Sequence, residues 1–154
     1  MDINKIHQLE ENNKEGLTYY FDIVNTYSKD LDDLIQLIKT EIISDKNYCN
    51  LYQYALELPY ALYYLAERVE ELGLKVDFAA IAKEDKYSRL LINAQGTIPE
   101  KQARATVFSN NEAHAKEIYE RCYYALKTKI NYGEQMLISL RALVGSMERE
   151  MQYA

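Results

Sequence analysis

Residues 119–151 read YERCYYALKTKINYGEQMLISLRALVGSMEREM. Along this stretch a seam recurs at alternating intervals of four and three: Tyr119, Tyr123, Leu126, Ile130, Gly133, Leu137, Leu140, Val144, Met147 and Met151. Heptad spacing places these residues on one side of an α-helix, where they can pack against another helix. The pattern predicts a helix over residues 109–151, about 65 Å long at 1.5 Å per residue. Such a length requires equally long partner helices or a second subunit.

Two earlier segments carry similar stripes. A helix is expected from near Gly16 to about Ser44, on the spacing of Leu17, Phe21, Val24, Tyr27 or Ser28, Leu31, Ile35, Ile38 and Ile42. Another is expected from about Tyr48 to Leu72, on the heptad seam of Leu51, Ala55, Leu58, Leu62, Leu65, Val69 and Leu72. Upstream, Ile3, Ile6 and Leu9 fit either a separate short helix or an extension of the first one.

Turn-forming and helix-breaking residues divide these segments. Residues 44–47 (SDKN) favour a turn, because their side chains can bond their own backbone. Pro59 predicts a kink or a helix end just before it. Gly73 favours a helix end, and Asp77 can cap a third helix over residues 78–94.

A second stop and start follows at residues 96–100 (GTIPE). Gly96 can end a helix, and Thr97, Pro99 and Glu100 have the types and spacing of a helix start with a capping box. Ser109 is a further candidate cap, unless the chain continues helically from Pro99. Gly133 within the last seam either allows close helix approach or weakens its helix.

The predicted fold class is all-α, because two prolines and five glycines are too few to punctuate a many-stranded sheet. We expect an elongated antiparallel helical bundle or coiled-coil hairpin with a long C-terminal helix. Residues 1–154 would form a single helical domain, with acidic, Tyr-rich helices over 1–73 and a helical hairpin plus the long helix over 77–152. A homodimer or higher homo-oligomer is plausible across the seams.

The sequence favours binding over catalysis. The five glycines are scattered, so phosphate-binding loops are absent, and neither His7 nor His114 has the spacing of a helical di-metal site. Adjacent carboxylates diverge by about 100° on a helix, and Cys49 and Cys122 lack metal-ligand spacing. We therefore predict no catalytic residue, no metal and no cofactor. The absence of a long apolar run and of a secretory signal pattern predicts a cytoplasmic protein without a membrane segment.

Charge is distributed unevenly along the chain. Residues 1–77 hold 7 Lys and Arg against 15 Asp and Glu, whereas residues 78–154 hold 11 against 9. Tyrosine is enriched among the residues that dominate protein interfaces, and carboxylates can steer association with a basic partner. Candidate protein-interface residues are Tyr19, Tyr20, Asp30, Asp32, Asp33, Tyr60, Tyr63, Tyr64, Glu67, Glu70 and Glu71.

A basic cluster lies on both sides of Gly96. Cations interleaved with an aromatic ring can bind phosphates and stack on a base. The candidate nucleic-acid contacts are Lys83, Lys86, Tyr87, Arg89, Lys101 and Arg104. Glu84, Asp85 and Glu100 lie among them, so a solvated hairpin of mixed charge is the alternative.

Residues 87–105 (YSRLLINAQGTIPEKQARA) resemble a stretch common among small helical coiled-coil proteins of tailed bacteriophages. These proteins have a basic helix, a Gly-Thr or Gly-Ser turn, a short helix ending in alanines and a long amphipathic C-terminal helix, a layout that residues 78–152 share. They are often encoded near recombination and single-stranded-DNA-binding genes. The resemblance implies a phage or prophage origin and a bacterial host cytoplasm.

Two functions stay open at this point. The protein is either an accessory factor in phage DNA recombination or replication, acting on nucleic acid or a nucleoprotein, or a protein-protein inhibitor of a host anti-phage defence system. The first would use the basic cluster and the second the acidic, Tyr-rich face. An architectural coiled-coil subunit is a further alternative.

Overall fold

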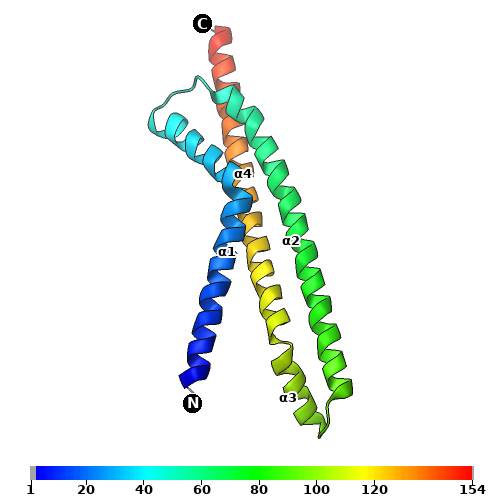
Figure 1. The fold of residues 1–154 in the computed structure, drawn as a ribbon. Coiled ribbons are helices and arrows are strands. Elements are labelled where there is room, and N and C mark those ends of the chain that lie inside the picture. The colour runs from blue at the N-terminus through cyan, green and yellow to red at the C-terminus, as the bar shows by residue number, and fades with distance from the viewer. Residues whose placement is uncertain (1–2, 154) are drawn as a thin grey trace. The chain divides into compact units, whose positions relative to one another are not determined.

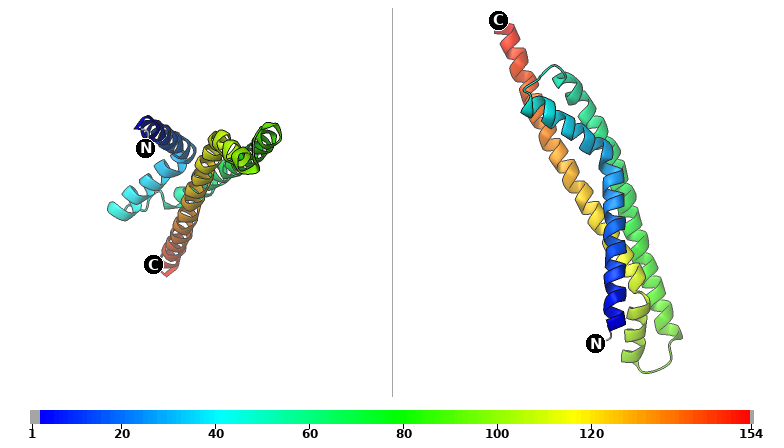
Figure 2. Two further views of the ribbon diagram at one scale, coloured as in Figure 1. Left: turned by 90° about the horizontal axis from the view of Figure 1, so that it is seen from below. Right: turned by 60° about the vertical axis from the view of Figure 1, so that its left-hand side comes forward.

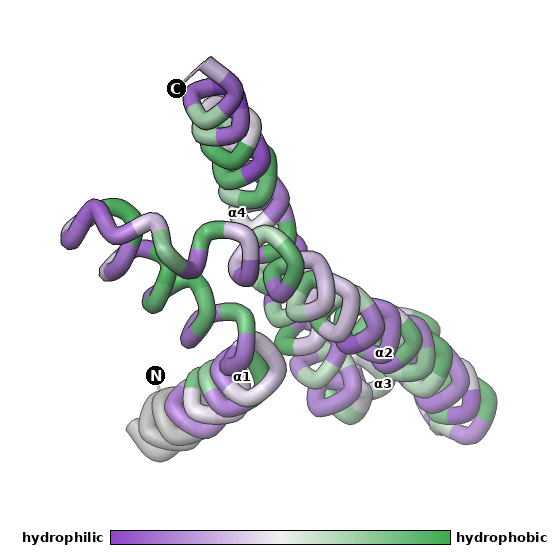
Figure 3. Tube along the Cα trace, turned by 90° about the horizontal axis from the view of Figure 1, so that it is seen from above, coloured by the Kyte–Doolittle hydropathy of each residue, from purple (hydrophilic) through white to green (hydrophobic). Residues whose placement is uncertain are grey.

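The computed structural model describes the backbone of residues 3–153 and the side chains of residues 14–153 (Figure 1). Its elements are α1 (Ile3–Ile38), the π-helical segment η1 (Lys39–Ser44), α2 (Leu51–Asn93), α3 (Ile98–Phe108) and α4 (Asn110–Tyr153). No strand occurs among these residues, so the all-α class is confirmed. Figure 3 shows polar and apolar residues alternating around the helices, as expected for apolar stripes on solvated helices.

Helix α1 begins at Ile3, so the N-terminal segment extends the first helix and is not a separate one. The predicted stripe is buried from Val24 onward. Of the two residues left open for one stripe position, Tyr27 or Ser28, it is Ser28 that is fully buried. Leu17 and Phe21 lie on α1 at the predicted spacing but are more than half exposed, so this end of the stripe is not part of the core. The residue of α1 that faces α4 at this level is the neighbouring Gly16. A Cβ on Gly16 would lie 3.3 Å from Ile118, so this small residue lets α1 approach α4 closely.

The turn predicted at residues 44–47 is confirmed. The helix widens at its end through the π-helical η1, where the Asp45 N–H donates to the Thr40 carbonyl, five residues back, at 3.0 Å. Lys46 has a φ of 52°, in the left-handed region. Asn47 Oδ1 accepts the Cys49 N–H at 3.1 Å, which extends the turn, so α2 begins at Leu51 and not at Tyr48.

The end predicted at Gly73 is wrong, because α2 continues unbroken from Leu51 to Asn93. Pro59 lies inside it, so the helix does not end there either, and Asp77 caps no helix. A glycine inside a helix costs about 1 kcal/mol relative to alanine. Burial of neighbouring leucines outweighs this cost, since Leu72 is fully buried beside Gly73.

The helix end and the new helix start predicted at residues 96–100 are confirmed. Gly96 has a φ of +119°, which favours glycine, between the end of α2 and the start of α3. The backbone N–H and the hydroxyl of Thr97 donate to Glu100 Oε2 at 2.9 and 3.0 Å. Ser109 separates α3 from α4, and its carbonyl accepts the Ala113 N–H at 3.2 Å. Figures 1 and 2 show α3 lying beside the last turns of α2 after this reversal.

The contacts divide the chain into two compact units. Unit 1 consists of Met1–Ile23 and Glu70–Tyr123, and unit 2 consists of Val24–Val69 and Tyr124–Ala154. Each unit therefore draws on α1, α2 and α4. The prediction of a single domain over residues 1–154 stays a prediction.

Unit 2 contains most of the buried apolar residues. Its core is formed by Val24, Leu31, Ile35, Ile38 and Ile42 before the turn, Leu51, Tyr54, Leu58, Leu62, Leu65 and Val69 on α2, and Leu126, Leu137 and Leu140 on α4. A Cβ on Gly133 would lie 2.6 Å from Leu62 and 3.5 Å from Leu31. Gly133 is thus a point of close helix approach, in agreement with one of its two sequence-based interpretations.

A polar cluster lies beside this core. Ser28 is completely buried, and its hydroxyl lies 2.8 Å from the Val24 carbonyl and 2.6 Å from Asp32 Oδ2. Lys129 from α4 donates to the Ser28 hydroxyl at 2.9 Å and forms an ion pair with Asp32. The cluster satisfies the serine where the helical stripe has a polar residue.

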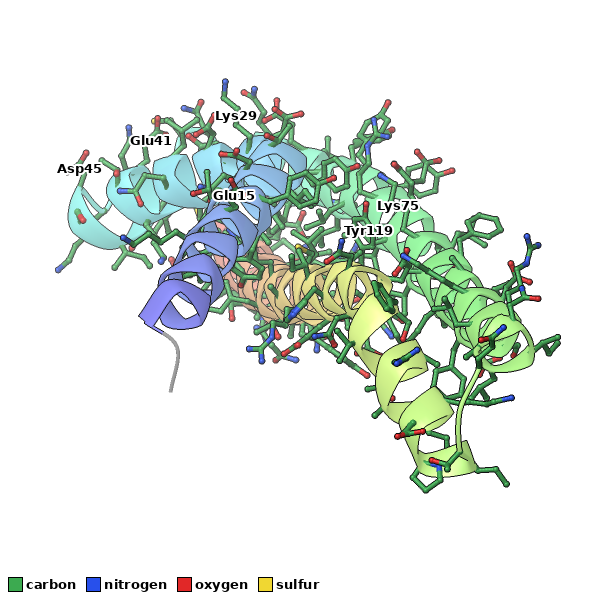
Figure 4. All side chains as sticks on the ribbon, turned by 60° about the horizontal axis from the view of Figure 1, so that its bottom comes forward. Glu15, Lys29, Glu41, Asp45, Lys75 and Tyr119 are labelled. Atoms are coloured by element: carbon green, nitrogen blue, oxygen red, sulfur yellow. The ribbon has the colours of Figure 1, made fainter. Side chains whose placement is uncertain are left out.

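Unit 1 buries fewer apolar side chains than unit 2 among those that the structure describes. Its buried apolar residues, among the side chains described, are Ile23, Leu72, Ala105 and Cys122. Tyr19 and Tyr119, the latter labelled in Figure 4, meet edge to face with their ring centroids 6.3 Å apart. The Cys122 thiol lies 3.9 Å from the Tyr20 carbonyl, and burial raises the pKa of this thiol to about 11.

Candidate protein-binding surface and basic cluster

Within unit 2, α2 carries a second face, opposite its buried seam. At about 100° per residue, Leu56, Tyr60, Tyr63 and Glu67 fall within an arc of about 60°, and Tyr64 lies at its edge. The four apolar or aromatic side chains are each 61 to 70% exposed. We call Leu56, Tyr60, Tyr63, Tyr64 and Glu67 the tyrosine face.

The tyrosine face combines paired aromatic rings with a negative charge. The rings of Tyr63 and Tyr64 meet edge to face, with centroids 6.0 Å apart. The hydrogen bond between Tyr63 and the Glu67 carboxylate raises the pKa of Tyr63, and so does the negative charge of that carboxylate. Arg68 is the one cation in the sequence of residues 51–69, and its guanidinium lies over the Tyr27 ring at 5.5 Å. The charged side chain on the tyrosine face itself is therefore a carboxylate.

The other predicted interface residues are distributed over both units. Asp30 and Asp33 are exposed on α1 in unit 2, whereas Asp32 is engaged by Lys129 and Ser28. Unit 1 contains Tyr19, which contacts Tyr119, the half-buried Tyr20, and Glu70 and Glu71 on α2. Glu71 forms an ion pair with Lys75 at 2.7 Å. The structure thus groups Tyr60, Tyr63, Tyr64 and Glu67 on one helix face, but does not group all eleven residues.

Leu56 belongs to the tyrosine face but was missed in the sequence analysis. The signal was present, because Leu56 precedes Tyr60 by four residues and Tyr63 by seven. Tyr52 borders the face, although its hydroxyl is drawn toward Glu148 at 3.3 Å. Apolar spacing was used to find the buried seam, and the same spacing on the opposite side was overlooked.

The basic cluster lies entirely within unit 1, on the last turns of α2 and on α3. Lys86 donates to Glu112 Oε1 at 2.6 Å, and Arg89 forms an ion pair with Asp85 at 3.0 Å. The bond from Lys86 lowers the pKa of Glu112. Lys83, Arg89 and Arg104 are exposed, and Lys101 and Tyr87 are half-buried. Two of the five cations are thus neutralised locally by carboxylates.

A pocket of about 390 Å³ lies beside this cluster, lined by Lys83, Glu84, Tyr87, Ser88, Thr106 and Ser109. The hydroxyls of Thr106 and Ser109 donate to carbonyls of their own helix, those of Gln102 and Thr106. They therefore offer lone pairs to the pocket and are poorly prepared to donate to a phosphate. With Glu84 also in the wall, the pocket is a weak anion site.

Among the residues whose side chains are described, no group of three or more His, Cys, Asp or Glu is placed to hold a metal ion. In the same part of the chain, no helix is long and apolar enough to cross a membrane. Cys49 is exposed and Cys122 is buried, both as free thiols.

Comparison of the chain with known protein families, with curated proteins and with solved structures finds no match. The surfaces of the molecule are therefore the basis for assigning its function.

Proposed function

We propose that this chain is a non-catalytic binding protein that uses the tyrosine face to bind a basic surface of another protein. The observation that supports this most strongly is the exposure of Leu56, Tyr60, Tyr63 and Tyr64 on one side of a helix whose other side is the core of unit 2. Large apolar side chains grouped on a protein surface are typical of interaction sites.

The size and chemistry of the face support a protein partner. Three tyrosines and a leucine can supply more than half of the roughly 800 Å² that one partner contributes to a standard interface. Tyrosine is enriched among the residues that dominate binding energy, since its ring loses little rotamer freedom. Because the face lies on a helix packed against a core, little ordering is needed on binding.

The charge of the face suggests the kind of partner. Glu67 is its charged side chain, and Asp30 and Asp33 are exposed elsewhere in the same unit. Arginine and lysine can stack on tyrosine rings and pair with carboxylates. We therefore propose a partner surface that combines arginine or lysine with apolar side chains.

The test is affinity capture from a bacterial host lysate with the intact protein and with the Tyr60→Ala/Tyr63→Ala variant. Loss of two interface tyrosines is expected to weaken binding by at least tenfold, corresponding to about 1.4 kcal/mol, and Glu67→Lys should weaken it with a salt dependence. Identical capture by the intact protein and by both variants would exclude the tyrosine face as the binding site.

The matched control is Phe108→Ala/Tyr153→Ala, which removes two aromatic side chains of similar or greater exposure on α3 and α4. This variant should capture the same protein as the intact chain. Circular dichroism should show unchanged helicity in all variants, because the substituted side chains lie outside the core.

The nucleic-acid alternative is tested separately on the basic cluster. A gel-shift assay with single- and double-stranded DNA at two salt concentrations should show no binding on our proposal. Salt-sensitive binding that is lost in Lys83→Ala/Arg104→Ala would instead favour the recombination or replication factor. Lys83 and Arg104 are the better choice, since Lys86 is already paired with Glu112.

The proposal includes the finer features expected from the sequence. These are an elongated antiparallel bundle with coiled-coil packing, a phage or prophage origin, a bacterial cytoplasmic location and action as an inhibitor of a host defence system. The heptad spacing of the buried residues on α2 supports coiled-coil packing. The resemblance of residues 78–152 supports the phage origin.

A further inference from the structure

In unit 1, α2 carries a separate apolar stripe on its exposed side. Leu74, Phe78 and Ile81 are spaced by four and three and are 58 to 66% exposed, and Ile92 continues the same line at 79%. With Leu74 and Ile81 as heptad d positions, Phe78 and Ile92 are a positions. Leu72, near the other side of the helix, is already buried within the chain.

The two edges of this stripe have opposite charges. The heptad g positions on one edge are Glu70, Asp77 and Glu84, all exposed acids. The e positions on the other edge are Lys75, Ala82 and Arg89. Lys75 is labelled in Figure 4. One edge is thus uniformly acidic, and the opposite edge carries two bases.

This division of charge discriminates between orientations of a second helix. When two identical helices run in the same direction about a twofold axis, the g edge of each meets the e edge of the other. Glu70 would then face Lys75 of the second copy, and Glu84 would face Arg89, five residues further along. When the helices run in opposite directions, like edges meet, which would set acids against acids.

We propose that the 70–92 segment of α2 is a self-association surface, on which a second copy of the chain packs in parallel through Leu74, Phe78 and Ile81. The stripe is self-complementary in shape, because a twofold axis places each side chain against its own counterpart. Its edges are self-complementary in charge in the parallel orientation alone.

The existing ion pairs do not prevent this arrangement. Lys75 pairs with Glu71, and Arg89 with Asp85, one turn away on the same helix. Both pairs are exposed and of the i,i+4 type, so each contributes little to stability and can be shared with a second helix. Glu71 occupies the preceding a position, and Asp85 and Ser88 occupy the next a and d positions, so the contact is short and has polar residues at both ends.

The first test measures mass by light scattering over a concentration series. The intact protein should show a concentration-dependent dimer, and Phe78→Glu should weaken dimerisation by at least tenfold without loss of helicity, since Phe78 is largely exposed. Tyr60→Glu is the matched control, because the Tyr60 side chain on the tyrosine face is about as exposed as that of Phe78. This variant should leave dimerisation unchanged. A chain that stays monomeric up to its highest soluble concentration would overturn the proposal.

The second test uses charge reversal to determine orientation. The variant Glu70→Lys/Glu84→Lys and the variant Lys75→Glu/Arg89→Glu should each fail to dimerise, because like charges then meet. A mixture of the two should form a heterodimer, because a basic edge then meets an acidic edge on both sides of the contact. Orientation is read from the first variant mixed with the intact protein. If that mixture associates more tightly than the intact protein does with itself, the helices are antiparallel and the proposal fails.

A third test is disulfide formation in a Cys49→Ser background. Leu74→Cys and Ile81→Cys should each crosslink two copies, since equivalent residues face each other along a parallel pair. An antiparallel pair can bring at most one of the two positions onto its twofold axis. Cys122 should not compete, because it is buried. Failure of self-association would leave the tyrosine face in unit 2 untouched, so the two proposals can fail separately.

Discussion

In unit 2, α1, η1, α2 and α4 bury fourteen apolar side chains around Leu31, Leu58 and Leu126. In unit 1, α1, α2, α3 and α4 bury four among the side chains described. Both units have apolar residues at heptad spacing. The difference is that unit 2 covers its stripes with its own helices, but unit 1 leaves Leu74, Phe78 and Ile81 exposed. Heptad spacing therefore indicates a helix that can pack against another helix. It does not indicate whether that other helix belongs to the same chain or to another molecule.

The largest expected difference is in the free energy of unfolding when one leucine of each unit is replaced by alanine. Leu126→Ala in unit 2 should lower the free energy of unfolding by about 2 to 5 kcal/mol, because the fully buried side chain leaves a cavity. Leu74→Ala in unit 1 should change it by no more than about 0.5 kcal/mol in the monomer. Urea denaturation at low protein concentration measures both. Equal losses would show that the Leu74 side chain is covered as completely as that of Leu126.

A smaller effect is expected at the polar cluster of unit 2. Lys129→Met removes the donor to Ser28 and the ion pair with Asp32 and should destabilise the fold by about 1 kcal/mol. A double-mutant cycle with Ser28→Ala should give a coupling of roughly 0.5 to 1.5 kcal/mol. Arg141→Met, at an exposed position on α4, is the control and should be close to neutral. A coupling of zero would mean that the cluster does not link α1 to α4.

The smallest effect concerns the start of α3 in unit 1. Backbone and side-chain hydrogen bonds from Thr97 lower the pKa of Glu100 from its ordinary value of 4.5. Its stabilising contribution is therefore fully present above pH 4.5 and is lost as the pH falls through the lower pKa of the folded state. Melting temperatures compared between neutral and acidic pH should show a weaker acid sensitivity in Glu100→Gln than in the intact protein. An unchanged sensitivity would exclude this carboxylate as a contributor.

Local signals predicted several features of the fold correctly. The GTIPE segment at residues 96–100 contains its own stop and start, because a glycine at positive φ and a threonine bonded to the glutamate three residues later need only their neighbours. The long α4 was equally predictable, since its apolar spacing extends over ten positions.

Gly73 and Leu17 show where local signals were insufficient. Gly73 permits a helix end, but the modest cost of a glycine inside a helix is offset by burial of residues far away in the sequence. Leu17 and Phe21 have helical spacing, yet the side of α1 that approaches α4 is that of Gly16, where a missing side chain makes room for Ile118. In the candidate site, Tyr60, Tyr63 and Tyr64 were identified from residue type alone, whereas the exposure of the face that they share with Leu56 followed from the orientation of α2.

The sequence by itself determined that this protein is helical, that the chain turns near residues 44–47 and 96–97, and which residues of α2 and α4 form apolar seams. These properties depend on turn residues and on intervals of three and four between apolar residues. Only the tertiary structure decided which stripes are covered and which are exposed. Burial depends on which helices meet and how closely, and that is settled by contacts between residues about a hundred positions apart, such as those of Ser28 with Lys129 and of Tyr19 with Tyr119.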